Sequence, residues 1–117
     1  MDNSKEILSI LNDDESRSIL KTLLSEELTI QQISSTLDIS QSSAYRKIRK
    51  LEDAGLIKKS KVIRTQDGSD ENYYKSMVYQ IMVLFKNGEL SLTLEKFKME
   101  DKIVRMWEKF SKNNIQP

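Results

Sequence analysis

The chain has 117 residues, of which 38% are hydrophobic and 32% charged, a balance typical of one soluble globular domain. It contains no cysteine and no histidine, which excludes disulfides, thiolate or imidazole metal sites and Cys/His or Ser/His/Asp nucleophiles. Its longest apolar run, Ile81 to Phe85, is far shorter than the ~20 residues that span a bilayer, and no hydrophobic signal region begins the chain. We therefore expect a cytoplasmic protein that is not an enzyme and has no cofactor, metal or membrane partner.

The net charge of +1 conceals an uneven distribution along the chain. Residues 1–40 carry three basic and eight acidic side chains, residues 41–65 carry eight basic and two acidic ones, and residues 66–117 carry eight of each. A basic block of this kind predicts a surface that faces a polyanion, and the alternative interpretation is a solvated helix face. The basic residues of the block are Arg46, Lys47, Arg49, Lys50, Lys58, Lys59, Lys61 and Arg64.

Helical periodicity predicts three helices within the first forty residues. Asn12 followed by Glu15 resembles a capping box at the start of the second helix, and Thr29 with Gln32 gives a clearer one at the start of the third. The apolar stripes that we expect to face the core are Ile7, Leu8, Ile10 and Leu11; Ile19, Leu20, Leu23 and Leu24; and Ile30, Ile33 and Leu37.

A fourth helix is predicted from Gln41 to about Ala54, with Ser40 as its N-cap and Gly55 just past its end. At 100° per residue, its core-facing side is Ala44, Ile48 and Leu51. The opposite side is polar and basic, and both acids of the helix, Glu52 and Asp53, lie at its far end. This sorting favours contact with nucleic acid over a merely solvated face. The outward residues are Ser42, Arg46 and Arg49, flanked by Ser43, Tyr45 and Lys50.

Two β-hairpins are predicted beyond Gly55. The first joins residues 56–65 to residues 72–77 through the turn cluster 66–70. The second turns at Asn87-Gly88, which favours a type I′ turn and pairs Phe85 with Leu90, Val83 with Leu92 and Ile81 with Leu94 on a face expected to seek the core. Residues 77–85 also admit a helical interpretation, because periodicity alone does not distinguish a short apolar strand from a helix.

A last helix is predicted over residues 99–112, with a large apolar stripe on one side. We expect this stripe to contribute to a dimer interface, the alternatives being packing on the domain's own core or a ligand pocket around Trp107. Its residues are Met99, Ile103, Met106, Trp107 and Phe110.

Residues 29–57, with an Ile-Ser entry at 39–40 and a Leu-Glu-Asp-Ala-Gly-Leu-Ile exit at 51–57, resemble the winged helix-turn-helix of ArsR-like transcription regulators, particularly small archaeal ones. The resemblance covers roughly residues 13–77. It implies an α+β, mostly α fold, with a DNA-binding domain over residues 1–79, its recognition helix at about 41–54 and its wing at about 56–77. The hairpin and helix of residues 80–117 would extend that domain and serve as a dimerisation element.

The resemblance further implies a homodimer that binds double-stranded DNA with the helix of residues 41–54 in the major groove; any effector stays unknown. Three departures qualify the analogy: the chain lacks the Cys and His ligands of metal-sensing relatives, its wing tip is acidic, and its second hairpin stands where relatives continue into a dimer helix. Wing contacts should therefore come from the stem. The residues implied to contact DNA are Gln41, Ser42, Ser43, Tyr45, Arg46, Arg49, Lys50, Lys58, Lys59, Lys61 and Arg64.

Two other functional hypotheses stay open at the level of sequence. The same fold can serve as a protein-interaction module whose basic face meets an acidic partner. RNA binding is a lesser variant, because few exposed aromatic residues besides Tyr45, Tyr73 and Tyr74 are available to stack on bases. Catalysis has the least support, since three glycines form no phosphate-binding loop and the acidic cluster at residues 13–15 suits a helix start.

Overall fold

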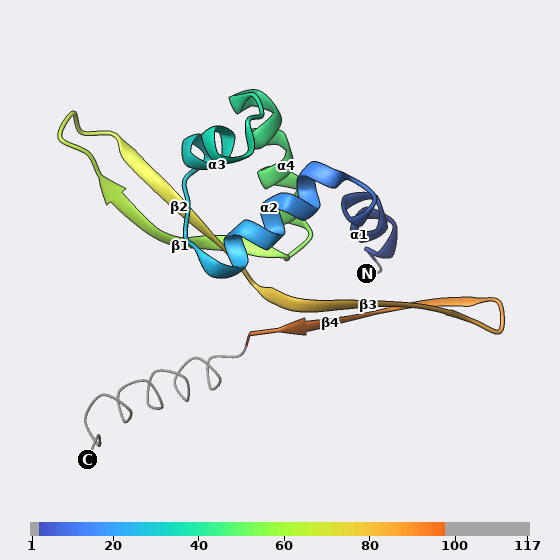
Figure 1. The fold of residues 1–117 in the computed structure, drawn as a ribbon. Helices are drawn as coiled ribbons and strands as arrows, with labels where there is room; N and C mark the ends of the chain where they lie inside the picture. The colour runs from blue at the N-terminus through green and yellow to red at the C-terminus, as the bar shows by residue number, and fades with distance from the viewer. Residues whose placement is uncertain (1–2, 98–117) are drawn as a thin grey trace, which may run out of the picture.

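The computed structural model describes residues 3–97, and Figure 1 shows four helices followed by two β-hairpins. The hairpins form two separate antiparallel sheets, which extend from the helical body in different directions. The predicted helix of residues 99–112 and its apolar stripe lie outside the described residues. The elements are α1 (Ser4–Leu11), α2 (Asp14–Ser25), α3 (Ile30–Leu37), α4 (Gln41–Asp53), β1 (Ile57–Arg64), β2 (Asp70–Ser76), β3 (Val78–Lys86) and β4 (Glu89–Lys96).

The predicted helix ends are confirmed for α3 and α4. Thr29 Oγ1 accepts a hydrogen bond from the Gln32 amide at 3.1 Å, and Gln32 Oε1 accepts one from the Thr29 amide at 3.0 Å, which completes the capping box. Ser40 Oγ accepts from the amide of Ser43 at 3.1 Å. Gly55 follows α4 with φ of 78°, a left-handed conformation that favours glycine.

The predicted start of α2 was wrong by one residue. Its N-cap is Asp13, whose Oδ2 accepts hydrogen bonds from the Ser16 amide at 3.0 Å and from Ser16 Oγ at 2.7 Å. Asn12 instead ends α1. A carboxylate at this position satisfies an unpaired amide and also interacts favourably with the positive end of the helix dipole.

The hydrophobic core lies where the four helices meet the base of both hairpins. The inward sides predicted for α1, α3 and α4 are buried or half-buried, but Leu24 was wrongly placed on the inward stripe of α2. Leu23 occupies the centre of that stripe, and a rotation of 100° carries Leu24 out to solvent. The buried apolar residues are Ile7, Ile10, Ile19, Leu23, Ile33, Ala44, Ile48, Leu51, Ala54, Leu56, Ile57, Tyr74 and Val78.

The first hairpin, β1–β2, is the wing. Its second strand begins at Asp70, two residues earlier than predicted, and a β-bulge lies between Lys59 and Lys61. A bridge between Leu28 and Tyr74, with hydrogen bonds of 3.2 and 2.8 Å between their backbones, ties β2 to the segment that joins α2 and α3. The base of the wing is therefore fixed to the helices, and its tip extends away from them (Figure 1).

The second hairpin, β3–β4, has the predicted register throughout, from Ile81 opposite Leu94 to Lys86 opposite Glu89. Asn87 and Gly88 have φ of 53° and 77°, as a type I′ turn requires, and β3 is a strand rather than the alternative helix. The expectation that its apolar face is buried was correct only near the base.

At the base of that face, the side chains of Ile81, Leu92 and Leu94 pack against the core. Further out, Val83 and Leu90 are each 46% exposed and Phe85 is 71% exposed. The cause is geometric, because the outer half of the hairpin extends beyond the helices that would otherwise cover it (Figure 1).

Candidate nucleic-acid interface

The outer face of α4 carries the polar and basic side chains that the sequence placed there. All of them are exposed except Ser43, which is half-buried, while Ala44, Ile48 and Leu51 on the other side are buried. Arg46 lies along the helix, donating from Nε to the Ser42 carbonyl at 3.4 Å and from Nη2 to Ser43 Oγ at 3.3 Å. These neutral partners leave the charge of Arg46 available to an anion.

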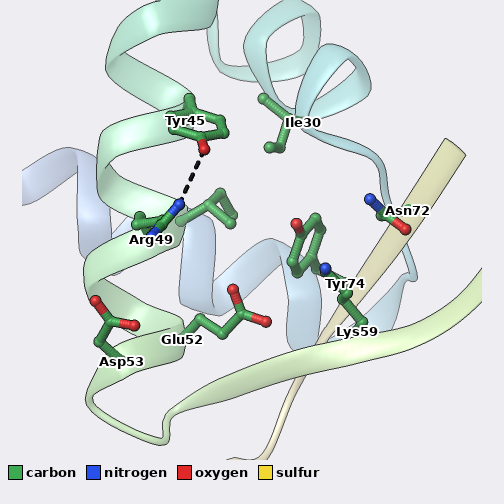
Figure 2. A pocket seen from close by; sticks show the side chains of 9 residues that line it. Ile30, Tyr45, Arg49, Glu52, Asp53, Lys59, Asn72 and Tyr74 are labelled. Carbon is green, nitrogen blue, oxygen red and sulfur yellow. Dashed lines mark hydrogen bonds between the residues drawn. The ribbon is translucent and has the colours of Figure 1, made fainter. Parts of the chain in front are cut away.

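Arg49 and Tyr45 form a pair one turn apart on the side of α4 that faces the wing. Arg49 Nη1 donates a hydrogen bond to Tyr45 Oη at 3.0 Å (Figure 2), and this bond raises the pKa of the arginine. Because Tyr45 fixes one edge of the guanidinium, the remaining N–H groups of Arg49 have a defined direction, which suits a bidentate contact.

A hollow of about 370 Å³ separates this side of α4 from the wing (Figure 2). Tyr45 and Arg49 line one end of it, and Glu52 and Asp53 line the other. The hollow would therefore attract a phosphate at its N-terminal end and repel one at its C-terminal end. The other lining residues, which come from α3, α4, β1 and β2, are Ile30, Ile48, Lys59, Asn72 and Tyr74.

Tyr74 is a polar residue of this hollow that the sequence analysis did not place among the DNA contacts, and the expectation that its ring is exposed was wrong. Its side chain is almost fully buried at the base of the wing, and Glu52 extends toward it from α4 (Figure 2). Burial, and then the negative charge of Glu52, raise the pKa of Tyr74. Its hydroxyl therefore stays protonated at neutral pH and can donate a hydrogen bond.

The wing cations fall into two groups. Lys61 Nζ lies 3.4 Å from Glu27 Oε2 and 4.7 Å from the ring centroid of Tyr73, and Arg64 Nε lies 3.4 Å from Asp70 Oδ1. Within residues 3–97, Lys58 and Lys59 form no ion pair and both are exposed. The predicted stem contacts Lys61 and Arg64 are thus partly neutralised, whereas Lys58 and Lys59 carry free charge.

Lys47 belongs to the basic block of the sequence but not to the outer face of α4. Its Nζ lies 2.6 Å from Asp13 Oδ2 and 3.4 Å from Glu15 Oε1, so that it joins α4 to the start of α2. Asp13 and Lys47 are 34 residues apart, and no local pattern in the sequence pairs them. The basic block therefore presents less charge to solvent than its composition indicates.

Residues 3–97 contain no group of three acidic side chains arranged to hold a metal ion. None of the helices there is long and apolar enough to cross a membrane.

Comparison with known proteins agrees with this architecture. Residues 7–60 match the model of a helix-turn-helix domain family, a range that contains all four helices except the start of α1. The chain is similar in structure to NolR from Sinorhizobium fredii, with a TM-score of 0.50 and 17% sequence identity, over 93% of this chain and 81% of that one. A search of curated proteins gave no match. The chain therefore contains a helix-turn-helix domain, and its fold is a winged helix-turn-helix.

Proposed function

We propose that this protein is a DNA-binding transcription regulator of the ArsR-like type, a homodimer that places α4 in the major groove and works in the cytoplasm without catalysing a reaction. The observation that carries the proposal is the outer face of α4, where Gln, Ser, Tyr and Arg side chains are exposed together and no acid occurs before Glu52. The helix-turn-helix match over residues 7–60 supports DNA as the partner.

The side chains divide by chemistry into base readers and phosphate binders. Arg46 and Arg49 suit bidentate contacts with guanine, and Gln41 suits adenine. The hydroxyl groups of Ser42, Ser43 and Tyr45 suit phosphate oxygens. Lys61 and Arg64 would exchange their present carboxylate partners for phosphates on binding. The cations that attract the backbone directly are Lys50, Lys58 and Lys59.

A homodimer would read two half-sites whose centres lie about one turn, 10–10.5 base pairs, apart, because its two recognition helices enter successive major grooves. Such a regulator would differ from the metal sensors that bind their ion through thiolates, because this chain has neither cysteine nor histidine. An effector, where one exists, would be a ligand of another kind.

The test is selection of bound fragments from genomic DNA, followed by gel-shift titration of the selected duplex and of a scrambled one. We expect Arg46→Ala to weaken binding to the selected duplex by about 1–3 kcal/mol while hardly changing the scrambled one. Lys58→Ala should weaken both duplexes alike. Failure to bind any duplex, together with co-purification of a stoichiometric protein partner, would contradict DNA binding and support the protein-interaction hypothesis.

A further inference from the structure

Strand β3 has the composition of an interior strand of a sheet. Its segment 78–85 contains no charged residue, and the apolar run Ile81–Phe85 places large side chains on both sides of the sheet. β4 instead alternates apolar residues with Ser, Thr and Glu. Continuous apolar runs are typical of buried interior strands, whereas alternation is typical of strands with one solvated face.

The described part of the molecule does not give β3 this environment. Met82 and Leu84 on one face, and Val83 and Phe85 on the other, are all exposed. Within residues 3–97, β3 pairs with β4 alone, so its other edge presents unpaired backbone groups. An open, long and apolar edge is a site where a further strand adds.

We propose that the free edge of β3 pairs antiparallel with β3 of a second copy, giving a four-stranded sheet in the order β4–β3–β3–β4. This arrangement makes β3 an interior strand of the sheet, closes its open edge and sets its apolar side chains beside those of the second copy on each face. The alternating β4 stays at the outside. It rests on the proposed homodimer and specifies the surface that forms it.

The register of this pairing follows from the composition of β3. The apolar run overlaps fully with its copy only when the two-fold axis passes beside Val83, with Ile81 opposite Phe85 of the second copy. The axis then brings no like charges together, because Lys86 faces Gln80 of the second copy.

Hydrogen bonding allows the same register. In a hairpin with a two-residue turn, the pair that flanks the turn exchanges hydrogen bonds, and alternate pairs do so along the ladder. Lys86 and Glu89 flank the turn, so the backbone groups of Ile81, Val83 and Phe85 point to the free edge of β3. These three residues meet each other across the proposed axis as hydrogen-bonded pairs.

Single cysteines test the axis directly, since the natural chain has none. Opposite residues of a hydrogen-bonded pair have Cα atoms about 5.5 Å apart, within the range of about 4.4–6.8 Å that a disulfide needs. Val83→Cys should therefore form a covalent dimer when micromolar protein is treated with diamide. Leu90→Cys is the matched control, because it lies on the same face of the hairpin with the same 46% exposure but on the outer strand β4.

In the proposed dimer, the two thiols of Val83→Cys meet at an effective concentration on the order of millimolar, whereas the thiols of Leu90→Cys on separate molecules meet at the micromolar concentration of the protein. We therefore expect Val83→Cys to cross-link at least about 100-fold faster than Leu90→Cys. Equal rates for the two variants, or a faster rate for Leu90→Cys, would overturn the proposed pairing.

Charge variants provide a second measurement that does not depend on a covalent bond. Val83→Lys and Val83→Glu should each be monomeric by light scattering, because like charges directly opposite destabilise a strand pair, and mixing the two should restore the dimer. A dimer that persists in both variants, including one held by the segment after residue 97, would contradict pairing at β3. Neither assay contains DNA, so a cross-linked dimer that binds no duplex would contradict the proposed function alone.

Discussion

At the scale of single residues, Asp13 has two roles: the cap that the sequence analysis assigned to Asn12, and an ion pair that the sequence did not indicate. It caps α2 through Ser16, and it holds Lys47 of α4 at 2.6 Å. The hydrogen bond from Lys47, followed by that from Ser16, lowers the pKa of Asp13 from 3.8 to about 2. The Asp13 carboxylate in turn raises the pKa of Lys47. One ion pair thus joins α4 to the start of α2.

Replacing Asp13 with Asn separates these two jobs, because Asn caps a helix as well as Asp but carries no charge. We expect Asp13→Asn to lower the free energy of unfolding at neutral pH by about 1 kcal/mol, since a carboxylate that is 38% exposed is partly screened. Asp14→Asn is the control: its carboxylate is 90% exposed, and the expected loss is below about 0.5 kcal/mol. Urea titration measures both.

The pH dependence of the Asp13 contribution follows from the direction of its shift. A carboxyl group with a lowered pKa in the folded state stabilises the fold above its unfolded pKa of 3.8. The stability difference between the natural protein and Asp13→Asn should therefore be constant at neutral pH, shrink as pH falls below about 4, and vanish only below the folded pKa of about 2. A difference that is undiminished at pH 2 would mean that the substitution disturbs the cap rather than the ion pair.

At the scale of elements, the helices and turns were largely predictable because their signals are local. Capping residues act on amides three positions away, and Asn87-Gly88 adopts the two positive φ angles that its turn needs. Two predictions that were wrong at this scale also have physical causes. Leu24 satisfies the apolar periodicity of α2 but lies at the edge of the stripe, and the outer half of the apolar hairpin face finds no helix to cover it.

The N-terminal cap of α4 gives a prediction at this scale. Ser40→Ala removes the hydroxyl that accepts from the Ser43 amide, and we expect a loss of about 1 kcal/mol in the free energy of unfolding. Ser35→Ala provides the comparison, because Ser35 is exposed within α3, where alanine is the better helix former. Denaturant titration should show a lower midpoint for Ser40→Ala only; equal midpoints would show that the cap contributes nothing to stability.

At the scale of the whole molecule, the small net charge conceals an acidic region and a basic region that are separate along the chain. The acidic first forty residues and the basic block of residues 41–65 nearly cancel in the sum. The fold uses part of this charge internally: Lys47, Lys61 and Arg64 pair with acids, and the partners of Lys47 and Lys61 belong to the acidic N-terminal region. The cations of the basic block that form no ion pair within residues 3–97 lie on α4 and at the base of the wing, which is the face proposed for DNA.

The salt dependence of DNA binding reports this arrangement. Each phosphate contact made by a lysine adds about one to the slope of log affinity against log salt concentration, so replacing Lys58 and Lys59 with Ala should reduce the slope by about two. Lys86→Ala, at the tip of the other hairpin, should leave the slope unchanged. Titrations at four salt concentrations measure it, and equal slopes for all three proteins would remove β1 from the interface.

The helix starts at Thr29 and Ser40, the buried and exposed sides of α4 and the register of the β3–β4 hairpin were predictable from the amino-acid pattern, because each depends on neighbours within a few residues along the chain. Which cations of the basic block are free depends instead on how distant segments pack together. Pairs such as Asp13–Lys47 and Glu27–Lys61 join residues that are 34 positions apart, and such distances leave no periodic trace in a sequence. Tertiary structure likewise decided that the apolar face of β3 runs past its own core, because burial depends on how far each element reaches.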